Sequence, residues 1–224
     1  MQRKKRRTLS MMKKRRRTQR NIRLGLFILV IVLIITCVIK IKNHIFSSNE
    51  YYEVDTEAVD ASKPDIDVEL LTPNPYSRSQ EKTDKITGIV IHYTANPGAT
   101  AIGNRNYFEG LKDSHKTKAS SNFVVGLEGE IVQCVPTWEI AYASNGRNHD
   151  TVSIECCHPD ESGKFNNATY RSMVQLTAWL CLKFNLTEQD VIRHYDVTGK
   201  NCPKYFVENE DAWNQFKEDV KQAM

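Results

Sequence analysis

A short segment late in the chain carries side chains that can do chemistry together. It runs His194-Tyr-Asp-Val-Thr-Gly-Lys-Asn-Cys202, and imidazole and thiolate are ligand types that zinc prefers. The Thr-Gly step lets the chain turn, so His194 and Cys202 can reach one metal ion. His92 is the candidate third ligand, because it closes the apolar run 86–91, which predicts a buried strand. Three protein ligands with one open position are typical of catalytic zinc rather than structural zinc.

Hydrolysis at such a metal needs two further groups, one that moves a proton and one that holds negative charge. In the segment 151–156, the period of a strand places Ser153 and Glu155 on one face. Glu155 ends that polar face, so we expect its carboxylate to project into a cleft and act as general base, then as general acid. Lys200 lies two residues before Cys202 and can bring an ammonium to the oxygen that gains charge.

The remaining elements predict what positions these groups. Strands alternate with helices, which is typical of an α/β fold with a central mixed β-sheet flanked by helices. The expected strands are 86–92, 121–128, 131–135, 151–156 and 191–193. The expected helices are 99–111, 167–184 and 209–222. We expect one compact domain over 70–224, which is long enough to bury one core.

The N-terminal part of the chain differs in charge from the rest. Residues 1–23 carry twelve Lys and Arg and no acid, so a net charge of +4 for the whole chain leaves −8 for the remainder. The apolar, uncharged run 24–39 follows, which predicts a single transmembrane helix at 24–41 and a basic cytoplasmic tail at 1–23. An acidic extended linker is expected at 42–69. A cleaved signal peptide is the alternative to the anchor. Anionic lipid headgroups are the simpler partner for the basic tail, so no nucleic acid is expected.

The cysteines leave a second chemistry open. Five of the six lie beyond the apolar run, and an odd number leaves at least one thiol unpaired, which a metal-bound thiolate would account for. The vicinal pair Cys156-Cys157 beside His158 raises the alternative of a hydrolase with a cysteine nucleophile. Neighbouring residues of a strand point to opposite faces, so we favour the metal site.

Four segments carry a family resemblance. They are 89–98, 120–126, 152–155 and 194–203, in that order. They resemble the zinc-dependent N-acetylmuramoyl-L-alanine amidases, a family that includes phage-lysozyme-type amidases and peptidoglycan recognition proteins. The resemblance covers about residues 70–222. It implies one zinc ion at the floor of a peptidoglycan groove, and cleavage of the amide between the lactyl group of N-acetylmuramic acid and L-alanine.

The resemblance also assigns roles to single residues. His92, His194 and Cys202 match the zinc ligands of the family. Glu155 matches the catalytic glutamate of those members that have one, and Lys200 matches the catalytic lysine of the last loop. These roles agree with the chemistry expected from the residue types alone.

One departure from the family pattern affects the site. Some relatives carry a catalytic Tyr where this chain has Ser120-Ser-Asn-Phe123, so that Tyr is absent and Glu155 is expected to take its share of the work. Substrate-binding residues are expected at Tyr93, Asn96, Asn122 and His158.

The sequence therefore predicts an N-acetylmuramoyl-L-alanine amidase that acts on peptidoglycan and muropeptides. It is expected in the bacterial cell membrane as a single-pass protein, with the N-terminus in the cytoplasm and the catalytic domain outside. The alternative is a non-catalytic peptidoglycan-binding receptor of the same fold. Such receptors are expected to lack a metal ligand, typically the thiol, and this chain keeps Cys202.

Overall fold

The computed structural model describes residues 59–224 together with residues 27, 29, 31, 32, 34–36 and 52. The chain divides into two units, Met1–Glu50 and Tyr51–Met224, and the second carries the strands and helices named below. Tyr52 and Val59 are buried in the core of this second unit. That core therefore takes in residues of the segment 42–69, for which the sequence predicted an extended linker.

The predicted localisation, a single-pass protein of the bacterial cell membrane with an extracytoplasmic domain, is wrong. Across the residues that the structure describes, no helix is long and apolar enough to cross a membrane. The apolar run 24–39 has sixteen residues, which as a helix reach about 24 Å against the roughly 30 Å of a bilayer's hydrocarbon core. Much of the predicted anchor 24–41 and all of the predicted tail 1–23 lie outside the described residues.

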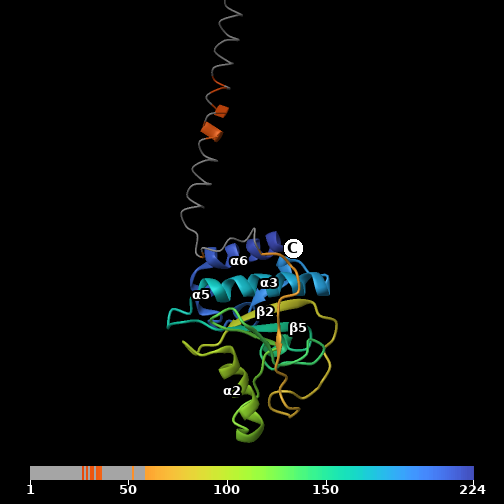
Figure 1. Ribbon diagram of the computed structural model, residues 1–224. Helices are drawn as coiled ribbons and strands as arrows, with labels where there is room; N and C mark the ends of the chain where they lie inside the picture. The colour runs from red at the N-terminus through yellow and green to blue at the C-terminus, as the bar shows by residue number, and fades with distance from the viewer. Residues whose placement is uncertain (1–26, 28, 30, 33, 37–51, 53–58) are drawn as a thin grey trace, which may run out of the picture. The chain divides into compact units, whose positions relative to one another are not determined.

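A six-stranded sheet forms the centre of the second unit (Figure 1). Its strands are β1 Asp67–Val68, β2 Gly88–Tyr93, β3 Phe123–Val125, β4 Ile131–Gln133, β5 Thr151–Cys156 and β6 Val191–Arg193. They lie in the order β1-β4-β3-β5-β2-β6. The β3–β4 pair is antiparallel and the other four pairs are parallel. The central mixed sheet predicted from the sequence is confirmed.

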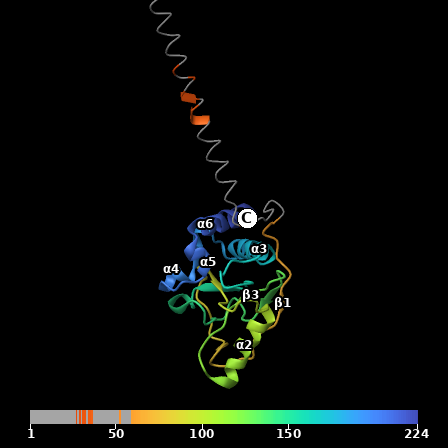
Figure 2. The same ribbon diagram turned by 90° about the vertical axis from the view of Figure 1, so that its left-hand side faces the viewer.

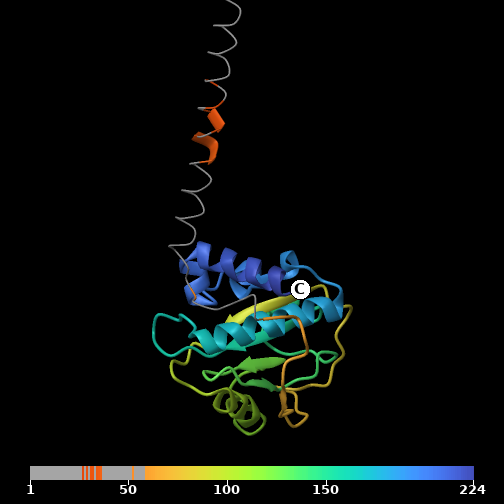
Figure 3. The ribbon, with the colours of Figure 1, turned by 45° about the horizontal axis from the view of Figure 1, so that its top comes forward.

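Helices cover both faces of this sheet. The helices α3, Asn167–Phe184, and α6, Glu210–Ala223, lie on one face, and α2, Ala101–Ser114, lies on the other (Figure 1). Figure 2 and Figure 3 show the same layers from two other directions. Alternation along the strands explains the division. Ile89 and Ile91 of β2 pack in the larger core with residues of α3 and α6, while Val124 of β3 packs in a smaller core with residues of α2.

The longer helices follow local signals that can be read in the sequence. The side chain of Thr100 accepts a hydrogen bond from the first turn of α2, and that of Asn166 does the same for α3. Asn185, with φ of 55°, ends α3 in the left-handed conformation. The sequence does not predict β1, α4 (His194–Thr198) or α5 (Lys204–Glu208). α4 and α5 have five residues each, too few for a helical period to repeat, and the two residues of β1 are too few to show an alternation of apolar and polar residues.

Candidate functional site

The candidate site lies at the carboxyl ends of β2, β5 and β6. In the register of the parallel strands, His92 of β2 pairs with Glu155 of β5, so their side chains project side by side from one face. β6 ends at Arg193, and His194 follows directly as the first residue of α4. Because these strands are parallel, their carboxyl ends meet at one edge of the sheet. Three groups that lie far apart in the sequence therefore come together there.

The loop after α4 returns the chain to this edge. α4 ends at Gly199, whose φ of 76° is left-handed and favours glycine. The backbone N–H of Tyr195 donates to the carbonyl of Cys202 at 2.8 Å, which closes the loop. The guanidinium of Arg193 donates to the carboxylate of Asp196 at 2.9 Å, which fixes the start of α4. Both ends of the loop are held, and the thiol stays at the edge of the sheet.

His92, His194 and Cys202 form the metal-ligand group. One ligand atom from each lies within 4.8 Å of the others, and all three residues are buried. Sγ of Cys202 is 3.9 Å from Nδ1 of His92, and the two imidazole centroids are 4.6 Å apart. Nδ1 of His194 is buried and has no hydrogen-bond partner among the described residues. Two imidazoles, one of which has a buried nitrogen without a partner, and a thiol are a ligand set that suits a borderline-soft divalent ion such as zinc.

Burial sets the protonation of the metal-ligand group. Desolvation and the nearby charges of His194 and Lys200 lower the pKa of His92 well below its ordinary value of 6.5. Burial, with Lys200, also lowers the pKa of His194. Burial raises the pKa of Cys202 to about 12, although the Tyr93 backbone N–H, hydrogen bonded to the thiol, opposes the rise. Both imidazoles are therefore neutral, as ligands must be, whereas the thiol has to release a proton when a metal binds.

Glu155 lies beside the metal-ligand group. Its Oε1 is 3.9 Å from Nδ1 of His92, and its Oε2 is buried without a partner in the described part of the chain. Burial raises the pKa of Glu155 to about 8, against the opposing ammonium of Lys200. A carboxyl group with a pKa in this range can both take and give a proton near neutral pH.

Lys200 supplies a positive charge to the same site. The residue is exposed in the loop after α4. Its ammonium lowers the pKa of every member of the metal-ligand group and of Glu155. One cation therefore acts on all four groups from the solvent side, where it can meet an oxygen that becomes negatively charged.

The rings of Tyr93 and His158 lie side by side. Their ring centroids are 5.1 Å apart. His158 is 1% exposed, and its Nδ1 donates to the carbonyl of Asp160 at 2.7 Å. Its Nε2 is therefore an acceptor, and this atom is buried without a partner among the residues that the structure describes. An unpaired acceptor at this place suits an N–H group of a bound substrate.

The other two residues expected to bind substrate are placed differently. The amide of Asn122 donates to the carbonyls of Val135 and Pro136, and its Oδ1 accepts from the backbone N–H and the hydroxyl of Ser153. Both donors and both lone pairs of Asn122 are used inside the fold, which leaves none for a substrate. Asn96 is exposed in the turn that follows β2.

Two residues that the sequence does not single out contact the imidazoles. Oγ of Ser144 is 3.1 Å from Nε2 of His92, and Oδ1 of Asn145 is 2.8 Å from Nε2 of His194. The sequence predicts a loop at 145–149 because Asn-Gly marks a turn. It carries no signal for the contacts themselves, because these depend on how the loop lies against the sheet.

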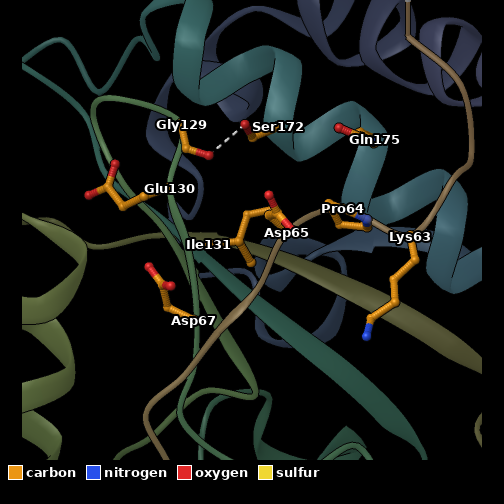
Figure 4. A pocket seen from close by; sticks show the side chains of 9 residues that line it. All are labelled: Lys63, Pro64, Asp65, Asp67, Gly129, Glu130, Ile131, Ser172 and Gln175. Atoms are coloured by element: carbon orange, nitrogen blue, oxygen red, sulfur yellow. Dashed lines mark hydrogen bonds between the residues drawn. The ribbon is translucent and has the colours of Figure 1, made fainter.

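A separate pocket lies beside α3 (Figure 4). It is open to solvent, has a volume of about 550 Å³, and is lined by Lys63, Pro64, Asp65, Asp67, Gly129, Glu130, Ile131, Ser172 and Gln175. Figure 4 shows Ser172 donating to the carbonyl of Gly129, with carboxylates of three acidic residues around the opening. Asp65 and Asp67 are exposed. Within the described part of the chain, the metal-ligand group is the one set of side chains placed to hold a metal.

Comparisons with known proteins identify the family. The family model for N-acetylmuramoyl-L-alanine amidase matches residues 82–205, more than half of the chain. The chain is 33% identical over 159 residues to the N-acetylmuramoyl-L-alanine amidase CwlL of Bacillus licheniformis, an alignment that covers 66% of this chain and 44% of CwlL. It is 31% identical over 172 residues to the N-acetylmuramoyl-L-alanine amidase BlyA of Bacillus subtilis (strain 168), covering 67% and 45%. The chain thus spans less than half the length of these relatives.

Solved structures share the fold. The structure of PlyL matches with a TM-score of 0.62 at 23% identity, covering 72% of this chain and 99% of that one. The catalytic domain of XlyA matches with a TM-score of 0.59 at 23% identity, covering 70% and 99%. At these identities the likeness shows the fold alone, while the family model and the curated relatives show the family. This chain belongs to the N-acetylmuramoyl-L-alanine amidase family.

Proposed function

We propose that this protein is a zinc-dependent N-acetylmuramoyl-L-alanine amidase that hydrolyses the amide between N-acetylmuramic acid and L-alanine in peptidoglycan. The observation that carries the proposal is the metal-ligand group beside Glu155, one oxygen of which is buried and unpaired among the described residues. The family and the named activities of the relatives support the same reaction. His92, His194 and Cys202 would hold one zinc ion.

Glu155 moves the proton in this reaction. A bound zinc ion supplies Lewis-acid polarisation of the scissile carbonyl and acidifies a water. Beside a bound cation Glu155 ionises more readily than burial alone allows, so it starts the cycle as a base. Its Oε2 takes a proton from the attacking water and then gives that proton to the nitrogen of the leaving L-alanine.

Other side chains hold charge and orient the substrate. The Lys200 ammonium faces the carbonyl oxygen as negative charge develops on it, which lowers the barrier to attack. Nε2 of His158 accepts an N–H of the substrate, and the ring of Tyr93 packs beside it. The buried surroundings of the metal-ligand group strengthen each of these electrostatic interactions relative to water.

Replacing Glu155 with Gln tests the proposal. Gln has nearly the same shape but cannot take a proton, so we expect kcat to fall by about 10²–10⁴-fold. Zinc content stays unchanged, because Glu155 is not one of the three ligands. The measurements are the release of new L-alanine amino termini from purified peptidoglycan, and the metal content of the purified protein.

The matched control is Glu128→Gln, the same change at an exposed carboxylate in the turn between β3 and β4. We expect this variant to keep full activity. Undiminished activity of Glu155→Gln would contradict the catalytic assignment. A zinc-loaded wild-type protein that binds muropeptides and exposes no new L-alanine amino termini would instead support the non-catalytic receptor as the function.

A further inference from the structure

Consecutive residues of one loop contact the two imidazoles of the metal-ligand group. The hydroxyl of Ser144 lies 3.1 Å from Nε2 of His92, and the carbonyl oxygen of the Asn145 side chain lies 2.8 Å from Nε2 of His194. In each ring the contacted atom is Nε2. Two neighbouring residues of one loop therefore contact two rings, one from β2 and one from the start of α4.

The opposite nitrogen of each ring, Nδ1, is the one that this loop does not contact. Nδ1 of His92 is 3.9 Å from Sγ of Cys202, and Nδ1 of His194 is buried without a partner in the described part of the chain. An amide Oδ1 only accepts hydrogen bonds, so Nε2 of His194 carries the proton and Nδ1 keeps its lone pair. The Ser144 hydroxyl can accept in the same way from Nε2 of His92.

We propose that Ser144 and Asn145 are positioning residues that hold both imidazoles as the Nε2–H tautomer and so present both Nδ1 lone pairs to one metal ion. The inference rests on the proposed metal-dependent function. It adds to that function the groups that decide which nitrogen binds. Neutral imidazole can carry its proton on either nitrogen, and a partner fixed on one of them decides which is left for the metal.

The loop that carries these two residues is itself held in place. Asn145 has φ of 51°, a left-handed conformation that Asn tolerates better than most residues. Oδ1 of Asn148 accepts from the backbone N–H groups of Ala143 and Ser144, at 3.1 and 2.5 Å. The guanidinium of Arg147 donates to the carboxylate of Asp150 at 2.8 Å. The acceptors are therefore fixed before a metal binds.

The main test is Asn145→Gly in the full-length protein. Asn145 is exposed and already left-handed, so Gly removes the acceptor without imposing backbone strain. We expect the Kd for zinc, measured by competition with a chromophoric chelator, to rise by about 10- to 100-fold. The matched control is Asn185→Gly, the same change at an exposed left-handed Asn at the end of α3, and it leaves the Kd unchanged.

A second readout separates tautomer control from a merely structural role. Long-range ¹⁵N NMR of the metal-free protein should show His194 with its proton on Nε2 in the wild type and in Asn185→Gly. In Asn145→Gly we expect a mixture of tautomers. Asn145→Asp keeps an acceptor and no donor, so it should retain both the Nε2–H tautomer and tight zinc binding. Ser144→Ala should shift the tautomer of His92 and leave that of His194 unchanged.

The outcomes distinguish this inference from the proposed function. If wild type binds zinc and Asn145→Gly binds it equally well, the positioning role is overturned while the metal-dependent amidase stands. A proton on Nδ1 of His194 in the metal-free wild type also overturns it. If the wild-type protein binds no zinc, both the proposed metal site and the positioning role of Ser144 and Asn145 are contradicted.

Discussion

Two clusters of buried polar side chains share one face of the central sheet and differ in how their hydrogen bonds are satisfied. The first, the Asn122 network, consists of Ser121, Asn122 and Ser153, whose side chains bond to one another and to main-chain groups. The second is the metal-ligand group with Glu155. There, Oε2 of Glu155 and Nδ1 of His194 are buried without partners among the described residues.

The difference separates buried polar groups that stabilise the fold from buried polar groups that are left open for a ligand. Ser153 and Glu155 are alternate residues of β5 and project from the same face, so the two clusters are neighbours. Leaving a buried polar atom unpaired costs roughly 1–3 kcal/mol. Such atoms persist in a native fold where something outside the chain completes them. In the proposed function, a metal ion and a substrate supply what the fold leaves open in this site.

Cys202→Ala should have the largest effect and act on the second cluster alone. Losing one of three ligands removes the ion, so we expect amidase activity to fall by about 10³-fold or more, equivalent to several kcal/mol of transition-state stabilisation. The free energy of unfolding of the metal-free protein should change little, because the thiol is a small buried group. Metal content, activity and urea unfolding after chelation check the three statements. Activity within tenfold of wild type would show that the thiol is not a ligand.

Asn122→Ala should have the opposite pattern. The change removes the acceptor of the Ser153 backbone N–H and the side-chain donor to the carbonyls of Val135 and Pro136, of which Pro136 still accepts from the backbone N–H of Glu139. We therefore expect the free energy of unfolding to fall by about 2–4 kcal/mol. The folded fraction should still bind zinc with wild-type affinity. Urea unfolding and zinc titration at low temperature measure the two quantities. If Asn122→Ala is as stable as wild type and has a raised KM for muropeptides, Asn122 binds substrate instead of stabilising the fold.

The sequence predicted the second cluster better than the first, for a physical reason. Metal chemistry depends on residue type, so His92, His194 and Cys202 can be recognised before their positions are known. Asn122 carries no such signature, because an amide serves a groove or a fold equally well. Its role depends on the register that brings the carbonyls of Val135 and Pro136 to it, and register is a tertiary property.

The same limit explains what else the sequence does not show. Ser144 and Asn145 lie in a segment that predicts a turn, and nothing local tells which strand the turn faces. β1 has two residues and joins β4 through contacts far apart in the chain. The helices α2, α3 and α6 could be predicted because their apolar residues recur over enough turns to show a period, and the strands β2 to β6 because apolar runs or alternation mark them.

The pH dependence of stability sharpens the comparison. Burial raises the pKa of Glu155 to about 8, from an ordinary value of 4.5. Between these two values the folded metal-free protein holds a proton that the unfolded chain has lost. The contribution of Glu155 to the free energy of unfolding therefore falls as pH rises from 4.5 to 8, by at most about 1.4 kcal/mol per pH unit. The lowered pKa values of His92 and His194 act in the opposite direction below pH 6.5, so the Glu155 slope is measured between pH 6.5 and 8.

Glu155→Gln should flatten the slope of the free energy of unfolding against pH, because the amide does not titrate. Zinc should flatten it too, because a cation favours the ionised carboxylate in the folded protein. Urea unfolding at a series of pH values, with and without zinc, measures this slope. Asn122→Ala serves as the control, since the Asn122 network contains no titrating group and its loss lowers the whole curve without changing the slope. An equal slope in Glu155→Gln and wild type would place the titration on another group.

The smallest expected effect comes from Thr94→Val, next to the metal-ligand group. Oγ1 of Thr94 is buried without a partner among the described residues, so replacing the hydroxyl with a methyl group should raise the free energy of unfolding, by no more than about 1 kcal/mol. The matched change in the Asn122 network, Ser121→Ala, removes a hydroxyl bonded to the carbonyls of Phe123 and Ser153 and should cost about 1 kcal/mol. Urea unfolding compares the two variants. If Thr94→Val and Ser121→Ala lower the free energy of unfolding equally, the Thr94 hydroxyl is already paired inside the fold. If Thr94→Val instead leaves stability unchanged and raises the KM for muropeptides, the partner of this hydroxyl is on the substrate.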